Sequence, residues 1–214
     1  MNTMDNYKLN VQATPMPITF PMRPMNGSRL ELRTEEFLER HDWEPKINDW
    51  RLLIHRPTGA MWNRYGERFT DAEKFTQAFE QLNVQFPEIV EYDWFDCLAM
   101  GRRTKIGAWS LFLLDLPNCR RPYLERRAIV ETYTEIIQFD VKPEPEQAYC
   151  LQRWVSPKLN VMRLQHSLLQ AVNAHWGEEF YEGLVAKRAA SKYTIQTQSP
   201  DKTTADWIKF RWRY

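Results

Sequence analysis

Cysteine is scarce in this sequence, and its three cysteines form no pattern. Cys97, Cys119 and Cys150 are odd in number and far apart, with no Cys-x-x-Cys pair. A disulfide scaffold needs an even set of cysteines, and a thiolate zinc site needs closely spaced pairs. The cysteines therefore argue against both and favour a reducing, cytosolic setting.

The sequence also lacks long apolar runs and an excess of charge of one sign. No stretch approaches the length of a membrane span, and the N-terminus has no charged-then-apolar signal pattern. With 29 basic and 28 acidic residues, the formal net charge is +1. No bulk field then draws the chain to nucleic acid or to a membrane. We expect a cytoplasmic protein without a membrane partner that contacts polyanions only through a local patch.

Several common catalytic motifs are absent as well. The chain contains neither G-x-G-x-x-G nor G-x-x-x-x-G-K-[ST], the two common loops that bind phosphates. It contains no H-E-x-x-H and no G-x-S-x-G, and its four histidines show no metal-ligand spacing. Any phosphate chemistry must therefore depend on another arrangement.

The sequence does contain enough apolar residues for one large domain, since 43% of its 214 residues are hydrophobic. Four prolines between positions 15 and 24 predict that residues 1–29 form an irregular arm, which leaves residues 30–214 as the domain. Strand-like and helix-like segments alternate without a βαβ repeat. This pattern predicts an α+β fold with largely antiparallel sheets flanked by helices.

Individual elements can be expected from turn and capping signals. Pro57-Thr58-Gly59 separates two strand-like segments, which predicts a hairpin, and Thr70 with Glu73 forms a capping-box pattern before a helix. Further helices are expected to begin near Pro122 and Pro157, the second ending at Gly177. Strands are expected at 88–100, 108–116, 182–189, 192–197 and 206–214.

Basic residues on the last strands are the first hint of function. Because alternate residues of a strand share a face, Lys209 and Arg211 point the same way, opposite Ile208. Two cations on one face are costly unless an anion or water meets them, and phosphate is a natural partner. A half-exposed edge strand with solvated cations is the alternative. Nearby, Gly183 permits a close approach, and Glu182 offers an oxygen ligand of the kind Mg²⁺ accepts.

The order of these segments resembles the nucleotidyltransferases that include ATP-dependent DNA ligases, RNA ligases and mRNA capping enzymes. That family's signature begins with K-x-D-G-x-R and ends with E-G-x-V-x-K followed by a strand like W-x-K-x-K. The matching segments here are KINDWR (46–51), NRYG (63–66), WFDCLA (94–99), SLFLLDL (110–116), EGLVAK (182–187) and WIKFR (207–211). PYLERR (122–127) also looks ligase-like. The resemblance covers residues 43–212 and is nearest to a minimal ATP-dependent DNA ligase.

The resemblance implies a mechanism. Lys46 would attack the α-phosphate of ATP to give lysyl-AMP, AMP would pass to a 5′-phosphate, and a 3′-hydroxyl would then seal the nick. Mg²⁺ or Mn²⁺ would assist, and the partner would be nicked or broken-ended nucleic acid, DNA in preference to RNA, bound by a monomer. The setting implied is DNA repair or replication in a bacterial or phage-infected cell.

The resemblance also assigns roles to other residues. Glu44 would read the adenine amino group, and an aromatic ring near Phe112 would pack on the base. Glu182 would bind metal, with Asp96 as a second metal ligand. The remaining nucleotide-binding residues would be Arg51, Arg64, Lys187, Lys209 and Arg211.

The sequence departs from the family at three points. Asn48-Asp49 stands where the family has Asp-Gly, and Leu98 stands where it has a glutamate that Asp96 or Glu91 would have to replace. The chain ends three residues after Arg211, so we expect a nucleotidyltransferase (adenylation) domain without an OB-fold. These departures keep two alternatives open: an RNA ligase, or a catalytically impaired homologue that binds nucleotides or nucleic-acid ends. A capping guanylyltransferase is disfavoured by Glu44.

Overall fold

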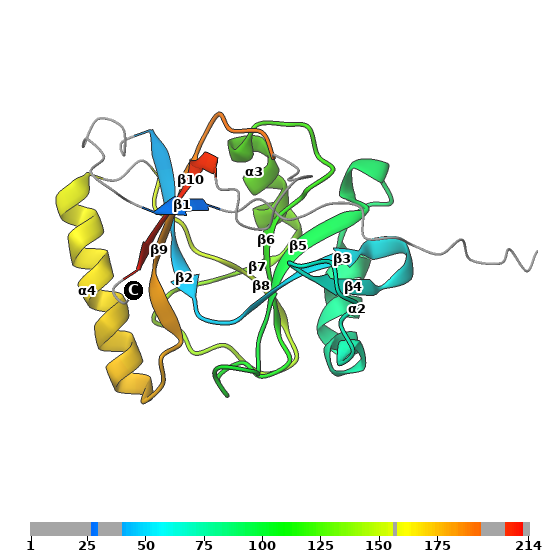
Figure 1. Cartoon of the computed structure of the whole chain (residues 1–214), viewed down its shortest axis with the longest axis horizontal. Helices are drawn as coiled ribbons and strands as arrows, with labels where there is room; N and C mark the ends of the chain where they lie inside the picture. Colours follow the sequence, from blue (N-terminus) through cyan, green and yellow to red (C-terminus); the bar gives the residue numbers. More distant parts are fainter. Residues whose placement is uncertain (1–26, 30–39, 156–157, 194–203, 212–214) are drawn as a thin grey trace, which may run out of the picture.

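The computed structural model describes residues 27–29, 40–155, 158–193 and 204–211. These residues form two β-sheets with α-helices packed on their outer faces (Figure 1). The expected α+β class with largely antiparallel sheets is confirmed. No helix in these ranges combines the length and the apolar character that a membrane crossing requires.

The smaller sheet has four strands in the order β1-β10-β9-β2. They are β1 (Gly27–Arg29), β10 (Thr204–Arg211), β9 (Tyr181–Arg188) and β2 (His41–Ile47). The pairs β10–β9 and β9–β2 are antiparallel, whereas β1 pairs with β10 in parallel. Residues 27–29, which the sequence assigned to the arm, thus form an edge strand of the sheet. The strand expected at 192–197 lies mostly outside the described residues.

The larger sheet has six strands in the order β4-β3-β5-β6-β8-β7. They are β4 (Ala60–Asn63), β3 (Trp50–His55), β5 (Trp94–Ala99), β6 (Leu111–Asp115), β8 (Ala148–Leu151) and β7 (Glu135–Ile137). The expected hairpin is confirmed: β3 and β4 pair across a 3-10 turn, η1 (Arg56–Thr58), which ends at Gly59 with φ of 64°. The β6–β8 and β7–β8 pairs are parallel, which the sequence did not predict.

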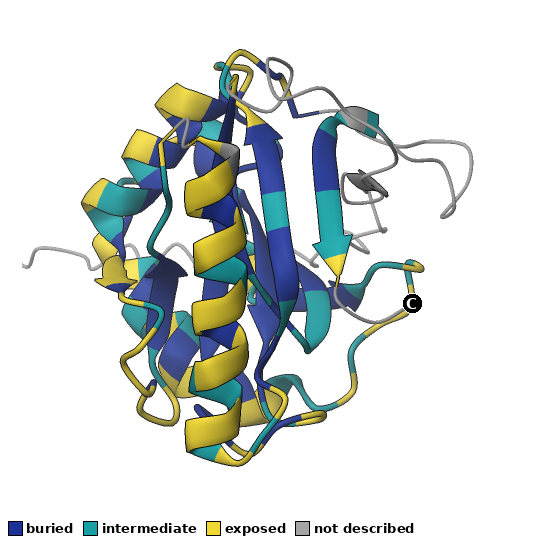
Figure 2. Ribbon diagram, turned by 90° about the vertical axis from the view of Figure 1, so that its left-hand side faces the viewer, coloured by how far each residue is buried: buried dark blue, intermediate teal, exposed yellow. Residues whose placement is uncertain are grey.

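Helix α4 (Leu159–Trp176) covers the outer face of the smaller sheet, where it exposes one side and buries the other (Figures 1 and 2). Its Met162 and Leu169 pack with Leu184 and Ile208 of the sheet. The helix ends at Gly177, whose φ of 72° confirms the predicted C-terminal cap. The sequence therefore located this helix end correctly.

Two helices pack on the larger sheet. In α2 (Thr76–Gln85), Ala78 and Leu82 are buried against strand residues such as Leu52. A 3-10 turn, η2 (Ala72–Phe75), precedes it without a side-chain cap, so the capping box expected at Thr70 and Glu73 is wrong. Helix α3 (Tyr123–Tyr133) begins directly after Pro122, as predicted.

Candidate active site

The pairing register of β2, β9 and β10 determines which side chains lie together at the candidate site. Paired residues in neighbouring strands point to the same side of a sheet. Three rows therefore share one face: Asp42, Lys187 and Trp207; Glu44, Val185 and Lys209; Lys46, Gly183 and Arg211. Ile208 is fully buried in the core that includes α4, on the other face, which confirms the predicted alternation in β10.

Glu182 reaches Lys46 because of a β-bulge. Lys46 pairs with Gly183, but Ile47 pairs with Tyr181, so Glu182 is the extra residue of the bulge. A bulge re-aims the side chain of its extra residue, and here the Glu182 carboxylate forms an ion pair with the Lys46 ammonium. Gly183 allows this geometry, since its φ is 145° and a Cβ atom there would lie 1.9 Å from the Phe210 carbonyl oxygen.

The surroundings of Lys46 make its amine easier to deprotonate. Burial lowers the pKa of Lys46, and the positive charges of Arg211 and Arg51 lower this pKa further. The Glu182 carboxylate acts in the opposite direction, and the net result is a pKa below the ordinary lysine value. An ammonium cannot act as a nucleophile, so this environment is what a reactive lysine requires.

A cluster of positive charges surrounds Lys46. The pKa of Lys209 is lowered to about 7, first by burial and then by Arg51, Lys46, Arg211 and Arg64. Arg211 lies 3.3 Å from Glu182, so both Lys46 and Arg211 share one carboxylate. Positive charge packed this closely favours binding of an anion, and planar guanidinium groups suit phosphate in particular.

The structure places Asp96 in contact with Arg51 and Tyr193. Its side chain is fully buried and accepts hydrogen bonds from Arg51 Nε at 2.7 Å and from the Tyr193 hydroxyl at 2.7 Å. Neighbouring Leu98 belongs to the apolar core. Glu91 lies in η3 (Val90–Tyr92), before the start of β5, where it faces Arg121 at 3.7 Å.

These placements bear on metal binding. The described residues contain no group of three or more His, Cys, Asp or Glu side chains arranged to hold an ion. Mg²⁺ is often bound by only one or two carboxylates together with substrate phosphates. Glu182 fits that pattern, because Lys46 and Arg211 both contact its Oε1 and the side chain is 21% exposed, whereas both oxygens of the fully buried Asp96 accept hydrogen bonds.

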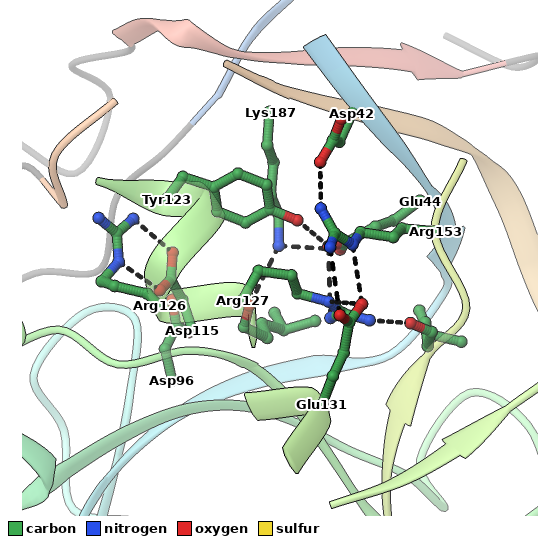
Figure 3. Close-up of polar contacts among 12 residues, drawn as sticks. Asp42, Glu44, Asp96, Asp115, Tyr123, Arg126, Arg127, Glu131, Arg153 and Lys187 are labelled. Atoms are coloured by element: carbon green, nitrogen blue, oxygen red, sulfur yellow. Dashed lines mark hydrogen bonds and ion pairs between the residues drawn. The ribbon is translucent and has the colours of Figure 1, made fainter. Parts of the chain in front are cut away.

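Glu44 and Lys187 lie deeper than Lys46, and they contact each other (Figure 3). Both side chains are 2% exposed, and the ammonium of Lys187 is 2.8 Å from the Glu44 carboxylate. Glu44 also accepts a hydrogen bond from the Tyr123 hydroxyl at 2.5 Å and faces Arg127 at 3.4 Å. Burial raises the pKa of Glu44, but Lys187 and Arg127 outweigh it and hold this pKa below the ordinary value.

Phe112 is also in the interior. It is 1% exposed and packs against Tyr149 and Phe180 at ring-centroid distances of 5.4 Å and 6.2 Å. Of the residues that the resemblance assigned to nucleotide binding, the structure therefore gathers Arg51, Arg64, Lys209 and Arg211 around Lys46. It buries Glu44, Lys187 and Phe112.

The sequence pattern does not reveal the wider network of charged residues in the interior around Glu44. Arg127 forms an ion pair with Glu131 at 2.9 Å. Arg153 forms ion pairs with both Glu131, at 2.8 Å, and Asp42. Beside this network, Arg126 forms a two-pronged pair with Asp115 at 2.7 Å and 2.9 Å. The one available signal was PYLERR, whose two adjacent arginines stand near the start of a helix that packs on a sheet. We call the linked set the Glu44 network: Asp42, Glu44, Tyr123, Arg127, Glu131, Arg153 and Lys187.

Asn48 and Asp49 connect β2 to the loop after β5. Asp49 accepts a hydrogen bond from the Gly101 amide at 3.0 Å, and Asn48 accepts one from Arg103 at 2.8 Å. Asp49 has no positive φ. A side chain at this position, where the family that the sequence resembles has glycine, therefore causes no backbone strain. This departure from the family therefore has a structural role as a link between two segments.

Comparisons with known proteins find similarity in structure alone. No family model and no characterised protein matches the sequence. The ligase domain of M. tuberculosis LigD matches with a TM-score of 0.57 and 16% identity, over 89% of this chain and 59% of that one.

Two other DNA ligases are similar in the same way. A Lig E DNA ligase matches with a TM-score of 0.52 and 10% identity, over 87% of this chain and 69% of that one. Chlorella virus DNA ligase-adenylate matches with a TM-score of 0.51 and 12% identity, over 88% and 68%. The chain spans about three fifths of the length of the LigD structures. It has the fold of the nucleotidyltransferase domains of ATP-dependent ligases.

Proposed function

We propose that this chain is an ATP-dependent polynucleotide ligase, or a ligase-like adenylyltransferase, that forms a covalent AMP intermediate on Lys46. The observation that carries the proposal is the environment of Lys46. Its pKa is lowered by burial and by neighbouring cations, and its ammonium is held against Glu182. A merely structural lysine gains nothing from four further cations at the same place, Arg51, Arg64, Lys209 and Arg211.

In the first step, the Lys46 ammonium gives up a proton to water, which its lowered pKa favours. The neutral amine then attacks the α-phosphorus of ATP. A nitrogen–phosphorus bond forms, the bond to the bridging oxygen breaks, and pyrophosphate leaves with the electron pair. Arg51, Lys209 and Arg211 stabilise the negative charge that builds up on the phosphate oxygens.

Glu182 is the carboxylate that would hold Mg²⁺ or Mn²⁺, with phosphate and water oxygens as the remaining ligands. Such an ion neutralises phosphate charge and helps the pyrophosphate to leave. The cations of this chain supply part of the same neutralisation through fixed side chains. We therefore assign Glu182, and not the fully bonded Asp96, to the metal.

The later steps require a nucleic-acid end. AMP passes from Lys46 to a 5′-phosphate, and a 3′-hydroxyl then displaces AMP and joins the strands. We propose DNA as the substrate, because three similar structures with TM-scores above 0.5 are named as DNA ligases. Repair or replication in a bacterial or phage-infected cell is the corresponding role.

A second candidate function is a homologue that binds nucleotides or nucleic-acid ends without forming the covalent intermediate. The specific observation in its favour is Leu98, which fills a family glutamate position with an apolar side chain packed in the core. Labelling of the protein with ATP distinguishes the two functions.

The experiment is incubation with α-labelled ATP and Mg²⁺ or Mn²⁺, followed by denaturing electrophoresis. We expect label that survives denaturation in the wild type and is absent in Lys46→Ala. Lys158→Ala removes an exposed lysine at the start of α4 and serves as the matched control. Treatment with pyrophosphate beforehand removes AMP that is already attached.

Two results decide between the functions. Label in the wild type and in Lys158→Ala, but not in Lys46→Ala, supports the covalent reaction, and nicked DNA and RNA substrates then identify the polynucleotide. An unlabelled wild type after pyrophosphate treatment rejects the ligase proposal in favour of the binding function.

A further inference from the structure

A pocket lies on the other side of the larger sheet from Lys46. Its volume is about 330 Å³, at the lower end of the range for small-molecule pockets. Trp50 and Ala99, from the ends of β3 and β5, contribute to its lining. Trp50 precedes Arg51 in β3, so its side chain is on the face opposite Arg51. The proposed adenylylation chemistry makes no use of this pocket.

The walls of the pocket are a continuous series of aromatic rings. Trp50 meets Phe69 at 5.5 Å between centroids, Phe69 meets Phe75 at 5.8 Å, and Phe75 meets Trp109 at 5.8 Å. Trp50, Phe69 and Trp109 remain partly exposed, whereas Phe75 is 2% exposed and forms the base of the series. Such a surface is suited to stacking with another flat ring.

The rim of the pocket carries positive charge. The Arg102 guanidinium stacks on the Trp50 ring at 3.3 Å from its centroid and is exposed to solvent. Lys74 lies 4.8 Å from the centroid of the Trp109 ring and pairs with Asp71 at 3.3 Å. Arg103 and Lys105 follow Arg102 closely and are exposed as well. Aromatic walls beside excess positive charge match a ligand that is both flat and anionic.

The pocket is joined to the segment that contains Lys46. The Asp49 carboxylate accepts the Gly101 amide, and Arg103 donates to Asn48, so the loop of Arg102 is tied directly to the strand end after Lys46. Trp109 has a φ of 65°, which is rare for a bulky residue and costs backbone energy. Strain at a partly exposed tryptophan is consistent with a binding role for its ring.

We propose that this pocket binds an unpaired base of a nucleic-acid strand, with the adjoining phosphate held by Arg102. The base stacks against Phe69 and Trp109, beside the Trp50 ring that Arg102 covers, and it needs no particular identity because every base has a stacking face. This inference rests on the proposed function only in taking nucleic acid as the partner. It adds a site that selects single-stranded or frayed ends near the Lys46 segment.

The test compares two duplex DNA probes with the same single-stranded overhang length, labelled with a fluorophore. One overhang carries bases, and the other consists of abasic sugar-phosphate units, so the two have equal charge. We expect the wild type to bind the base-carrying probe about tenfold more tightly, as measured by fluorescence anisotropy. Trp109→Ala is expected to remove most of this difference, whereas Arg102→Ala is expected to weaken the binding of both probes alike, because both carry the phosphate.

Two further variants make the result specific. Arg163→Ala removes an exposed arginine on α4, at the other sheet, and is expected to keep the full preference for bases. Arg102→Lys retains the charge that would hold the phosphate, so we expect it to bind both probes nearly as the wild type does. A thermal melt of Trp109→Ala checks that the loop remains folded, and Arg102→Ala does not disturb the core.

Equal affinity of the wild type for the two probes would overturn the proposal, as would an unchanged preference in Trp109→Ala. The labelling of Lys46 is independent of this outcome. Normal lysyl-AMP formation with no base preference rejects the pocket alone, and a base preference without lysyl-AMP rejects the ligase proposal alone.

Discussion

Lys46 and Glu44 are two residues apart on the same face of β2, yet they lie in opposite electrostatic environments. Lys46 is 15% exposed, its partner Glu182 is 21% exposed, and further cations crowd around the pair. Glu44 is 2% exposed, and its positive neighbours Lys187 and Arg127 are almost fully buried with it. One end of the face has surplus positive charge near solvent, and the other has balanced charge in the interior.

On the proposed mechanism, this difference separates the reactive lysine from a structural one. Lys187 is paired with Glu44 and donates to the Leu114 carbonyl oxygen at 3.1 Å, so its ammonium is stabilised. Lys46 shares its carboxylate with Arg211 and has a lowered pKa. Lys46 and Lys187 thus lie on the same face of the sheet and each shares a carboxylate with an arginine, but Lys46 is more exposed and has further cations, Arg51 and Lys209, close to it.

The largest effect is expected at Gly183, which pairs with both Lys46 and Arg211. Gly183→Ala would bring a Cβ atom to 1.9 Å from the Phe210 carbonyl oxygen at a φ of 145°, so β9 and β10 could not remain paired there. We expect a loss in the free energy of unfolding of at least about 4 kcal/mol, measured by urea denaturation.

Gly177→Ala is the matched control for this substitution. Gly177 also has a positive φ, of 72°, but a Cβ atom added there would have no other atom within 4 Å. It should cost only about 1–2 kcal/mol. Equal losses at the two glycines would show that backbone conformation, and not the close approach of β10, explains why position 183 requires glycine.

The next effect distinguishes the two environments directly. Glu44→Ala leaves Lys187 and Arg127 buried without their shared carboxylate, and we expect it to cost about 3–5 kcal/mol of unfolding free energy. Glu182→Ala affects partly exposed cations and should cost about 1 kcal/mol, while it prevents efficient labelling by ATP. Similar stability losses for the two variants would contradict the distinction.

A smaller effect concerns the pH dependence of the covalent step. The Arg211 charge disfavours the protonated form of Lys46, so Arg211→Ala should raise the pKa of Lys46. At a given pH less of the amine is then neutral, and the midpoint of the rate of lysyl-AMP formation moves to higher pH. Single-turnover labelling across a pH series measures this midpoint, and Arg163→Ala should leave it unchanged.

A separate effect is the pH dependence of stability that Lys209 contributes. Its pKa is about 7 in the folded protein and 10.5 for an ordinary lysine, so between these values the unfolded chain binds more protons. Stability contributed by this group therefore increases as the pH rises from 7 to 10.5. Thermal melts should show a shallower rise over this window in Lys209→Met, and an unchanged slope would contradict the assignment.

Much of this site follows from the sequence because strand alternation and motif order are local properties. They predicted correctly that Lys209 and Arg211 share a face and that the α4 segment ends at Gly177. Motif order also assigned Lys46 and Glu182 to the same site. Only the register of β2 and β9 reveals the bulge that brings the two side chains into contact.

The remaining features depend on contacts between distant segments. The resemblance assigned Glu44 to the adenine, but it could not reveal that α3 supplies Arg127 and Tyr123 against its carboxylate. The hydrogen bonds from Arg51 and Tyr193 to Asp96 connect three separate parts of the chain, so no local pattern predicts them. The capping box failed as well, since the 3-10 turn η2 occupies Ala72–Phe75 and α2 begins only at Thr76.

The central claim is that Lys46, among the lysines on this sheet face, is the one that reacts. Peptide mass spectrometry after incubation with ATP and Mg²⁺ tests it directly, because it locates the adduct on a residue. We predict an AMP adduct on the peptide that contains Lys46 and none on the peptides of Lys187 or Lys209. An adduct on Lys187 or Lys209 in place of Lys46, or none on any of the three, would contradict the account.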